Sequence, residues 1–286
     1  RRDMMKEACE KAIKLEPGLY WAHLGLGAIN IELEKWTDAA AALEPIRTQV
    51  VQSPFACRLY VKALCECGAY GIVDQMLSEM KAEQRSLDVL VEAARGLQLA
   101  ARYEDAIRWA RQALDRDEFN TGAMNIMADS LAKLAENGET GWHRDTAHEA
   151  IKYYRRVQQQ RPKDLVLANN IAWLEVKALG LPNDAEQSAA PLREVQDTSA
   201  FPPGFLETLG VIEVERGRCD EGRKYLERAA ASGEKASYFY HLALAYHGLD
   251  LQDRAKEALF QASRLPKSPR EHAEYLEVAK RIEKGR

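Results

Sequence analysis

Residues 236–262, ASYFYHLALAYHGLDLQDRAKEALFQA, decide the fold. An apolar segment around the pair Leu242-Ala243 is followed by a second apolar pattern at Ala255, Leu259 and Ala262. Spacings of four and seven residues place those last three side chains on one face of a helix. The stretch therefore predicts two helices joined by a short turn.

The second-helix pattern recurs along the whole chain. Residues equivalent to Ala255 follow one another at spacings of 34, 33, 44, 38, 34 and 33 positions: Ala39, Val73, Ala106, Ala150, Ser188, Gly222 and Ala255. Four residues after each come Leu43, Leu77, Ala110, Tyr154, Leu192, Leu226 and Leu259, and three further on Ile46, Met80, Ala113, Val157, Val195, Ala229 and Ala262. Seven units are predicted, two of them lengthened.

The first helix of each unit carries a pair whose second member is usually glycine or alanine: Leu26-Gly27, Tyr60-Val61, Ala93-Ala94, Met127-Ala128, Ile171-Ala172, Leu209-Gly210 and Leu242-Ala243. Side-chain size at the contact sets the distance between packed helices. The pair therefore predicts the closest approach within each hairpin.

With these residues the chain resembles the tetratricopeptide-repeat family, whose 34-residue unit carries a Leu-Gly pair in its first helix and spaced small and large residues in its second. The Asn-Asn-x-Ala-Trp-Leu style of residues 169–174 resembles bacterial members. The resemblance implies an all-α fold, a right-handed α-solenoid of about seven helix-turn-helix repeats with a C-terminal capping helix.

The repeats are predicted at 19–53, 54–86, 87–119, 120–163, 164–202, 203–235 and 236–267. Residues 1–16 are expected to form the second helix of a truncated repeat. Residues 268–286 are expected to form the capping helix, because Ser268 and Pro269 read as an N-cap and a first helical residue.

Two irregularities interrupt the repeats. Repeat four contains an insertion at 135–146 whose glycines predict a turn-bearing loop, with part of the extra length continuing the helix. It is read as a surface bulge or, alternatively, as a partner contact through Trp142. Extra residues in repeat five are placed near 180–183, and Pro191 predicts a kink or a late helix start because proline removes a helical hydrogen bond.

Composition argues against several classes of protein. Forty Lys and Arg against 44 Asp and Glu give a formal net charge of -4, so no nucleic-acid partner is expected. No run approaches the roughly 18 apolar residues that a membrane span requires. Five cysteines without disulfide-scaffold spacing favour a reducing compartment, and the cytoplasm is expected. An upstream signal outside this sequence would make the periplasm the alternative.

Catalytic and metal-binding patterns are missing from the sequence. The six histidines contain no i, i+4 pair, and Cys65-Glu66-Cys67 is not a C-x-x-C motif. Neither a phosphate-binding glycine loop nor a nucleophile elbow occurs. We therefore expect no enzyme activity, no cofactor and no metal site.

The family resemblance implies that the first helices line a concave groove. Candidate peptide-binding residues there are Arg58, Lys62, Arg95, Asn125, Asp129, Asn169, Trp173, Tyr240 and Leu244, and further groove positions include Phe55, Gln98, Glu207 and His247. The basic residues and amides fit an acidic segment or a C-terminus of a partner. The apolar Trp173, Tyr240 and Leu244 suit an amphipathic helix instead.

The predicted function is a protein–protein interaction scaffold that binds a peptide or helix of a partner in this groove. The alternative is a regulatory or assembly module of a larger protein, such as an enzyme or a bacterial envelope or export complex, with its activity outside these residues.

Overall fold

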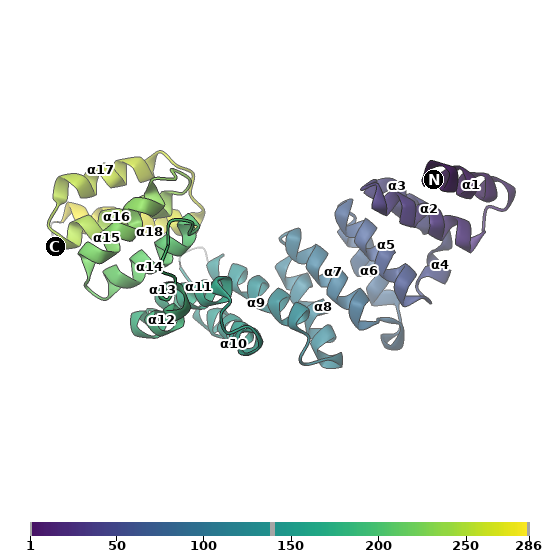
Figure 1. Ribbon diagram of the computed structural model, residues 1–286, viewed down its shortest axis with the longest axis horizontal. Helices are drawn as coiled ribbons and strands as arrows, with labels where there is room; N and C mark the ends of the chain where they lie inside the picture. The colour runs from purple at the N-terminus through teal and green to yellow at the C-terminus, as the bar shows by residue number, and fades with distance from the viewer. Residues whose placement is uncertain (1, 138–140, 285–286) are drawn as a thin grey trace. The chain divides into compact units, whose positions relative to one another are not determined.

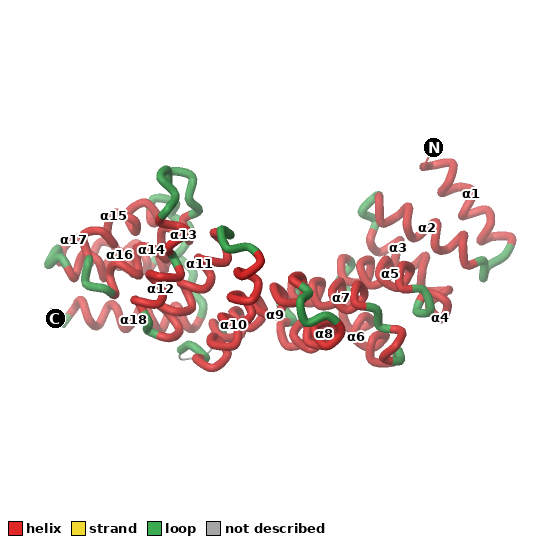
Figure 2. The backbone as a smooth tube through the Cα atoms, turned by 60° about the horizontal axis from the view of Figure 1, so that its bottom comes forward, coloured by secondary structure: helices red, strands yellow, loops and turns green. Residues whose placement is uncertain are grey.

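The computed structural model describes residues 2–137 and 141–284, which form helices joined by short connections without any β-strand (Figures 1 and 2). The predicted ends at residues 1, 285 and 286, and positions 138–140 of the predicted insertion, lie outside the described residues. The chain divides into two compact units, residues 1–130 and 131–286.

Unit 1 consists of helix pairs in the predicted order. Its elements are α1 (Arg2–Leu15), α2 (Tyr20–Glu32), α3 (Trp36–Leu43), η1 (Glu44–Ile46), α4 (Arg47–Val50), α5 (Pro54–Glu66), α6 (Tyr70–Glu79), η2 (Ala82–Gln84), α7 (Leu87–Leu99) and α8 (Tyr103–Arg116). The unit boundary falls inside α9 (Thr121–Glu136).

Unit 2 continues the pattern and ends with a single helix. Its elements are α10 (Arg144–Gln160), α11 (Leu165–Leu174), η3 (Glu175–Leu179), α12 (Pro182–Ser188), α13 (Ala190–Arg193), α14 (Pro203–Glu215), α15 (Cys219–Ala230), α16 (Ala236–Gly248), α17 (Gln252–Ser263) and α18 (Pro269–Glu283). As predicted, Ser268 caps α18: its Oγ accepts from the Glu271 amide and the Glu271 carboxylate accepts from the Ser268 amide.

Small residues mark the closest helix approaches. A Cβ added to Gly27 of α2 would lie 2.7 Å from Leu43 Cγ of α3, and one added to Gly210 of α14 would lie 2.5 Å from Leu226 Cγ of α15. Both leucines occupy the same position of their repeats. The predicted role of the second residue in each pair is therefore confirmed at these two hairpins.

The periodic second-helix residues are buried. The position four residues into the pattern is at most 8% exposed in all seven repeats: Leu43, Leu77, Ala110, Tyr154, Leu192, Leu226 and Leu259. Every repeat therefore packs its second helix against its first, and outside repeat five it does so with the same helix face.

Repeat five differs from the predicted register. Ser188 and Val195 are only half-buried, and Val195 lies beyond the end of α13. The fully buried residues with spacings of four and seven are instead Ala185, Ala189 and Leu192. The prediction for this helix was wrong by three residues, and the second helix is interrupted at Ala189, just before Pro191.

Most of the extra length of repeat five also lies elsewhere than predicted. The first and second helices begin 16 positions apart in repeat one, at Tyr20 and Trp36, but 17 apart in repeat five, at Leu165 and Pro182. One extra residue is absorbed by η3, a π-helical turn. The remaining extra residues lie in the connection 194–202 between α13 and α14, not at 180–183.

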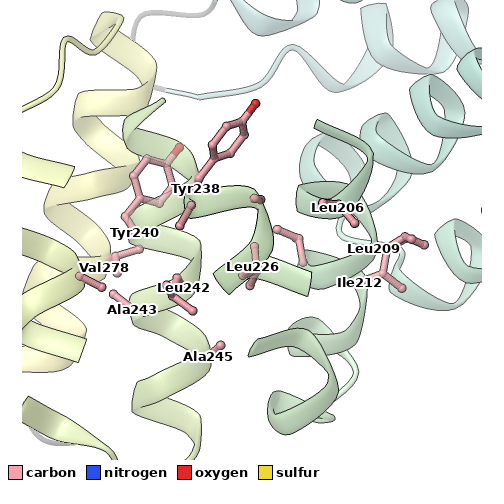
Figure 3. Close-up of a cluster of buried hydrophobic side chains, with 14 of the residues drawn as sticks. Leu206, Leu209, Ile212, Leu226, Tyr238, Tyr240, Leu242, Ala243, Ala245 and Val278 are labelled. Atoms are coloured by element: carbon pink, nitrogen blue, oxygen red, sulfur yellow. The ribbon is translucent and has the colours of Figure 1, made fainter. Parts of the chain in front are cut away.

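The core of unit 2 runs through its hairpins to the capping helix. Leu209, Ile212 and Leu226 pack between α14 and α15, and the cluster continues through Tyr240 to Val278 of α18 (Figure 3). The helix α18 therefore covers the last hairpin, as a terminal repeat requires.

Candidate functional site

Three predicted basic residues lie on the first helices α5 and α7 of unit 1, which pack against each other. Arg58 and Arg95 are exposed, and neither has an ion-pair partner in the described part of the chain. Lys62 is half-buried, with Nζ 5.5 Å from the ring centre of Trp36. We call Arg58, Lys62 and Arg95 the basic surface.

The predicted residues of α9 are half-buried. Asn125 lies four residues before Asp129, on the same face of the helix. Gln98 Nε2 of α7 donates to Asp129 Oδ2 at 3.2 Å. The structure thus joins two of the predicted groove positions, Gln98 and Asp129, across neighbouring first helices.

Unit 2 contains a cavity of about 260 Å³, the first-helix cavity. It is lined by Lys133, Glu136, Asn169, Asn170, Trp173, Gly204, Glu207, Thr208, Lys235, Ser237, Tyr240, Arg270 and Glu271. Apart from Lys235, which precedes α16, these residues belong to α9, α11, α14, α16 and α18. The cavity therefore joins the first helices of repeats four to seven and the capping helix.

Asn169 provides an unused acceptor beside this cavity. Its Nδ2 donates to Asn170 Oδ1 at 3.4 Å, while Asn170 Nδ2 donates to the Tyr154 hydroxyl at 3.3 Å. The Asn169 Oδ1 atom is buried without a hydrogen-bond partner. A buried amide oxygen without a partner is stabilised when a ligand or a water molecule donates a hydrogen bond to it.

The cavity is more polar than the sequence predicted. Six charged side chains line it beside the aromatic Trp173 and Tyr240, so the expected apolar second half of the groove is not found there. Tyr240 is only 1% exposed, and its hydroxyl donates to Glu274 Oε2 at 2.8 Å. Burial, together with Glu274, raises the Tyr240 pKa. Leu244 lines a second cavity of about 150 Å³.

A polar network connects the two cavities, since Lys177, His241 and Glu274 line the second cavity and Glu207 lines the first. The Lys177 ammonium donates to His241 Nε2 at 3.1 Å and lies 3.5 Å from Glu274 Oε2. His241 Nδ1 donates to Glu207 Oε1 at 2.9 Å. Burial lowers the His241 pKa, and the positive charge of Lys177 lowers it further, so the imidazole is neutral at neutral pH.

Two members of this network were not predicted. Lys177 lies in the π-helical turn η3 and Glu274 in the capping helix α18. Neither belongs to a first-helix position of the repeat pattern. The single-residue lengthening of repeat five was the only sequence signal for Lys177.

Trp142, from the insertion, contacts the capping helix. Its Nε1 donates to Glu274 Oε1 at 3.2 Å, and the Arg270 Cζ atom lies 4.5 Å from its ring centre. The ring is half-buried. Part of the inserted length extends the helices, as predicted, since α9 has 16 residues and α10 has 17. Trp142 thus makes an intramolecular contact in unit 2.

No family model and no curated protein sequence matches the chain. Among solved structures, the APC/C hetero-tetramer Cut9–Hcn1 matches 84% of the chain at 15% identity with a TM-score of 0.51; the chain spans 45% of that protein's length. A tetratricopeptide repeat protein from Parabacteroides merdae matches 84% of this chain and 90% of its own, at 16% identity and a TM-score of 0.47. YrrB, a tetratricopeptide-repeat protein with an unusual peptide-binding site, is 17% identical to this chain with a TM-score of 0.49. The match covers 73% of this chain and 97% of YrrB.

The hairpins recur every 33 or 34 residues outside repeats four and five, and in repeats one and six a buried glycine faces a buried leucine. The chain has the tetratricopeptide-repeat fold. The tetratricopeptide hairpins place both the basic surface and most of the first-helix cavity on first helices. Within the described residues, no helix has the length and apolarity to cross a membrane, and no cluster of His, Cys, Asp and Glu could hold a metal ion.

Proposed function

We propose that the chain is a protein-interaction scaffold that binds an extended segment of a partner protein along its first helices. The observation that carries this proposal is the lining of the first-helix cavity, which draws side chains from the first helices of repeats four to seven. A segment lying across these helices contacts several repeats at once. The amides of Asn169 and Asn170 can bond the backbone of such a segment.

The polarity of the cavity favours an extended segment over an amphipathic helix. A helix bound in a groove contributes an apolar face and needs an apolar wall opposite it. The cavity instead has charged and amide groups, which match the hydrogen-bonding groups of an extended backbone. We therefore favour the peptide form of the predicted function.

The basic surface of unit 1, taken by itself, supports binding of acidic residues or a C-terminal carboxylate of the partner protein. Guanidinium groups bind carboxylates through paired, charge-assisted hydrogen bonds. Arg58 and Arg95 are exposed and lack an intramolecular ion pair among the described residues.

All five cysteines are free thiols, which supports a reducing compartment, and we place the scaffold in the cytoplasm.

Selection from a random peptide library displayed on phage tests the proposal. We expect the full chain to enrich peptides with acidic residues, and Arg58→Glu/Lys62→Glu/Arg95→Glu to lose at least about tenfold in affinity for them, because several charge-assisted bonds are lost. The matched control is Lys14→Glu/Lys35→Glu/Lys81→Glu, which makes the same charge change at exposed sites off the first helices. Equal loss in both triple variants, or no enriched peptide, would contradict the proposal.

A further inference from the structure

Glu207 presents a carboxylate to the first-helix cavity without a direct cationic partner. The residue is 6% exposed on α14, and its Oε1 accepts from the neutral His241 at 2.9 Å. Its Oε2 has no hydrogen-bond or ion-pair partner among the residues described. Desolvating a carboxylate is costly unless a cation or several donors approach it. Glu207 is therefore an acceptor that a cationic ligand would stabilise.

Two of the three cations that line the cavity are paired with carboxylates other than Glu207. Lys133 Nζ lies 3.0 Å from Glu136, and Arg270 Nη1 lies 2.8 Å from Glu274. Lys235 Nζ lies 5.9 Å from the ring centre of Tyr238.

The polar network around His241 and the capping box of α18 also provide no direct cationic contact to Glu207. Lys177 lies beside Glu274, and the His241 imidazole separates it from Glu207. The remaining carboxylate of the cavity, Glu271, accepts from the Ser268 amide in the capping box. None of these groups neutralises Glu207 by direct contact.

Two further groups complete a site for a planar cation. The buried Asn169 Oδ1 is a second acceptor without a partner, and Trp173 lines the same cavity. A guanidinium group offers five N–H donors in one plane and stacks on aromatic rings. The cavity of about 260 Å³ lies below the range of about 300–1,000 Å³ typical of small-molecule sites, which suits a single side chain.

We propose that the first-helix cavity binds the guanidinium group of an arginine side chain, with Glu207 and Asn169 as acceptors and Trp173 as the stacking surface. This inference rests on the proposed function, because the arginine belongs to the partner segment bound along the first helices. The partner would then be recognised in two ways: its acidic residues by the basic surface, and an arginine by the first-helix cavity.

The probe is N-acetyl-arginine N-methylamide, with the neutral isostere N-acetyl-citrulline N-methylamide as its control. Each is titrated into the full chain, and the indole N–H resonance of Trp173, assigned with Trp173→Phe, reports binding by NMR. We expect a saturable shift with the arginine derivative and at least about tenfold weaker binding of the citrulline derivative, because a charged hydrogen bond is worth more than a neutral one.

Two variants locate the site. Glu207→Gln keeps the side-chain volume and the bond to His241, and should weaken arginine binding about tenfold, to the citrulline level. Asn169→Asp adds a carboxylate and should strengthen arginine binding, so a folding defect cannot mimic its expected result. Glu215→Gln, at an exposed position of the same helix, should change neither.

Equal binding of the two derivatives, unchanged arginine binding in Glu207→Gln, or stronger binding of N-acetyl-aspartate N-methylamide would overturn the inference. The probe needs no partner protein. Enriched peptides without arginine binding would therefore contradict this inference alone. Arginine binding without enriched peptides would contradict the proposed function alone.

Discussion

Gly210 lies where the two helices of repeat six come closest. A Cβ at this position would be 2.5 Å from Leu226 Cγ and 3.1 Å from the carbonyl oxygen of Gly222. The backbone neighbour cannot rotate away, so Gly210→Ala should destabilise the fold by about 2 kcal/mol through overpacking. Urea unfolding followed by far-UV circular dichroism measures the change.

The same helix contains a matched control for Gly210. A Cβ at Gly204 meets nothing within 4 Å. Gly204→Ala should leave stability unchanged or raise it by up to about 1 kcal/mol, because alanine loses less backbone entropy in a helix. A Gly210→Ala variant as stable as Gly204→Ala would show that the hairpin has room for a methyl group.

At single residues, the sequence predicts which side chains are buried but not how polar ones are used. The recurring pair predicted that its usually small second residue marks the closest helix approach, and Gly27 and Gly210 confirm this in repeats one and six. Tyr240 was predicted as a groove residue, yet it is buried and bonded to Glu274 of α18. That contact joins residues 34 positions apart, on a helix outside the repeat pattern.

The capping helix α18 is tied to unit 2 by Glu274. Burial raises the Glu274 pKa, but the positive charges of Lys177 and Arg270 and the hydrogen bond from Tyr240 lower it more, and the resulting pKa is about 2. A carboxyl whose pKa is depressed in the folded state stabilises the fold above its unfolded value near 4.5 and loses that contribution as the pH falls toward 2. The shift corresponds to about 3 kcal/mol at neutral pH.

Glu274→Gln should therefore lower the unfolding free energy by about 3 kcal/mol at neutral pH, with the difference from the unmodified chain shrinking below pH 4.5. Denaturant unfolding between neutral pH and pH 2 measures both quantities. Glu277→Gln, at an exposed position of the same helix, is the control. A constant difference across this range would mean that the network does not hold Glu274 ionised.

At the scale of helices, periodic spacing predicts well that a helix is present. It predicts the register of that helix poorly where a repeat contains extra residues. The interruption near Pro191 was predicted from proline chemistry and is observed at Ala189. The three-residue error at Ser188 arose because one extra residue is absorbed within η3 and the others in a connection. The number of extra residues in a repeat cannot show whether they form a longer loop or a π-helical turn. Only the π-helical turn η3 accounts for the position of Lys177 in this structure.

Across the whole molecule, stability should vary from repeat to repeat. In repeat proteins each hairpin packs on its neighbours, so the free energy is nearly a sum of local terms. The two compact units are consistent with such separate packing. Gly210→Ala should therefore speed amide hydrogen exchange in α14, α15 and the adjoining α12 and α16, with exchange in α2, α3 and α5 unchanged.

Exchange followed by mass spectrometry compares Gly210→Ala with the unmodified chain, and Gly204→Ala is again the control. Faster exchange by the same factor in every helix would mean that the chain unfolds as one cooperative body. A confined effect would mean that unit 1 retains its basic surface while unit 2 opens. The two kinds of contact proposed for the partner protein could then be weakened independently, because they depend on different hairpins.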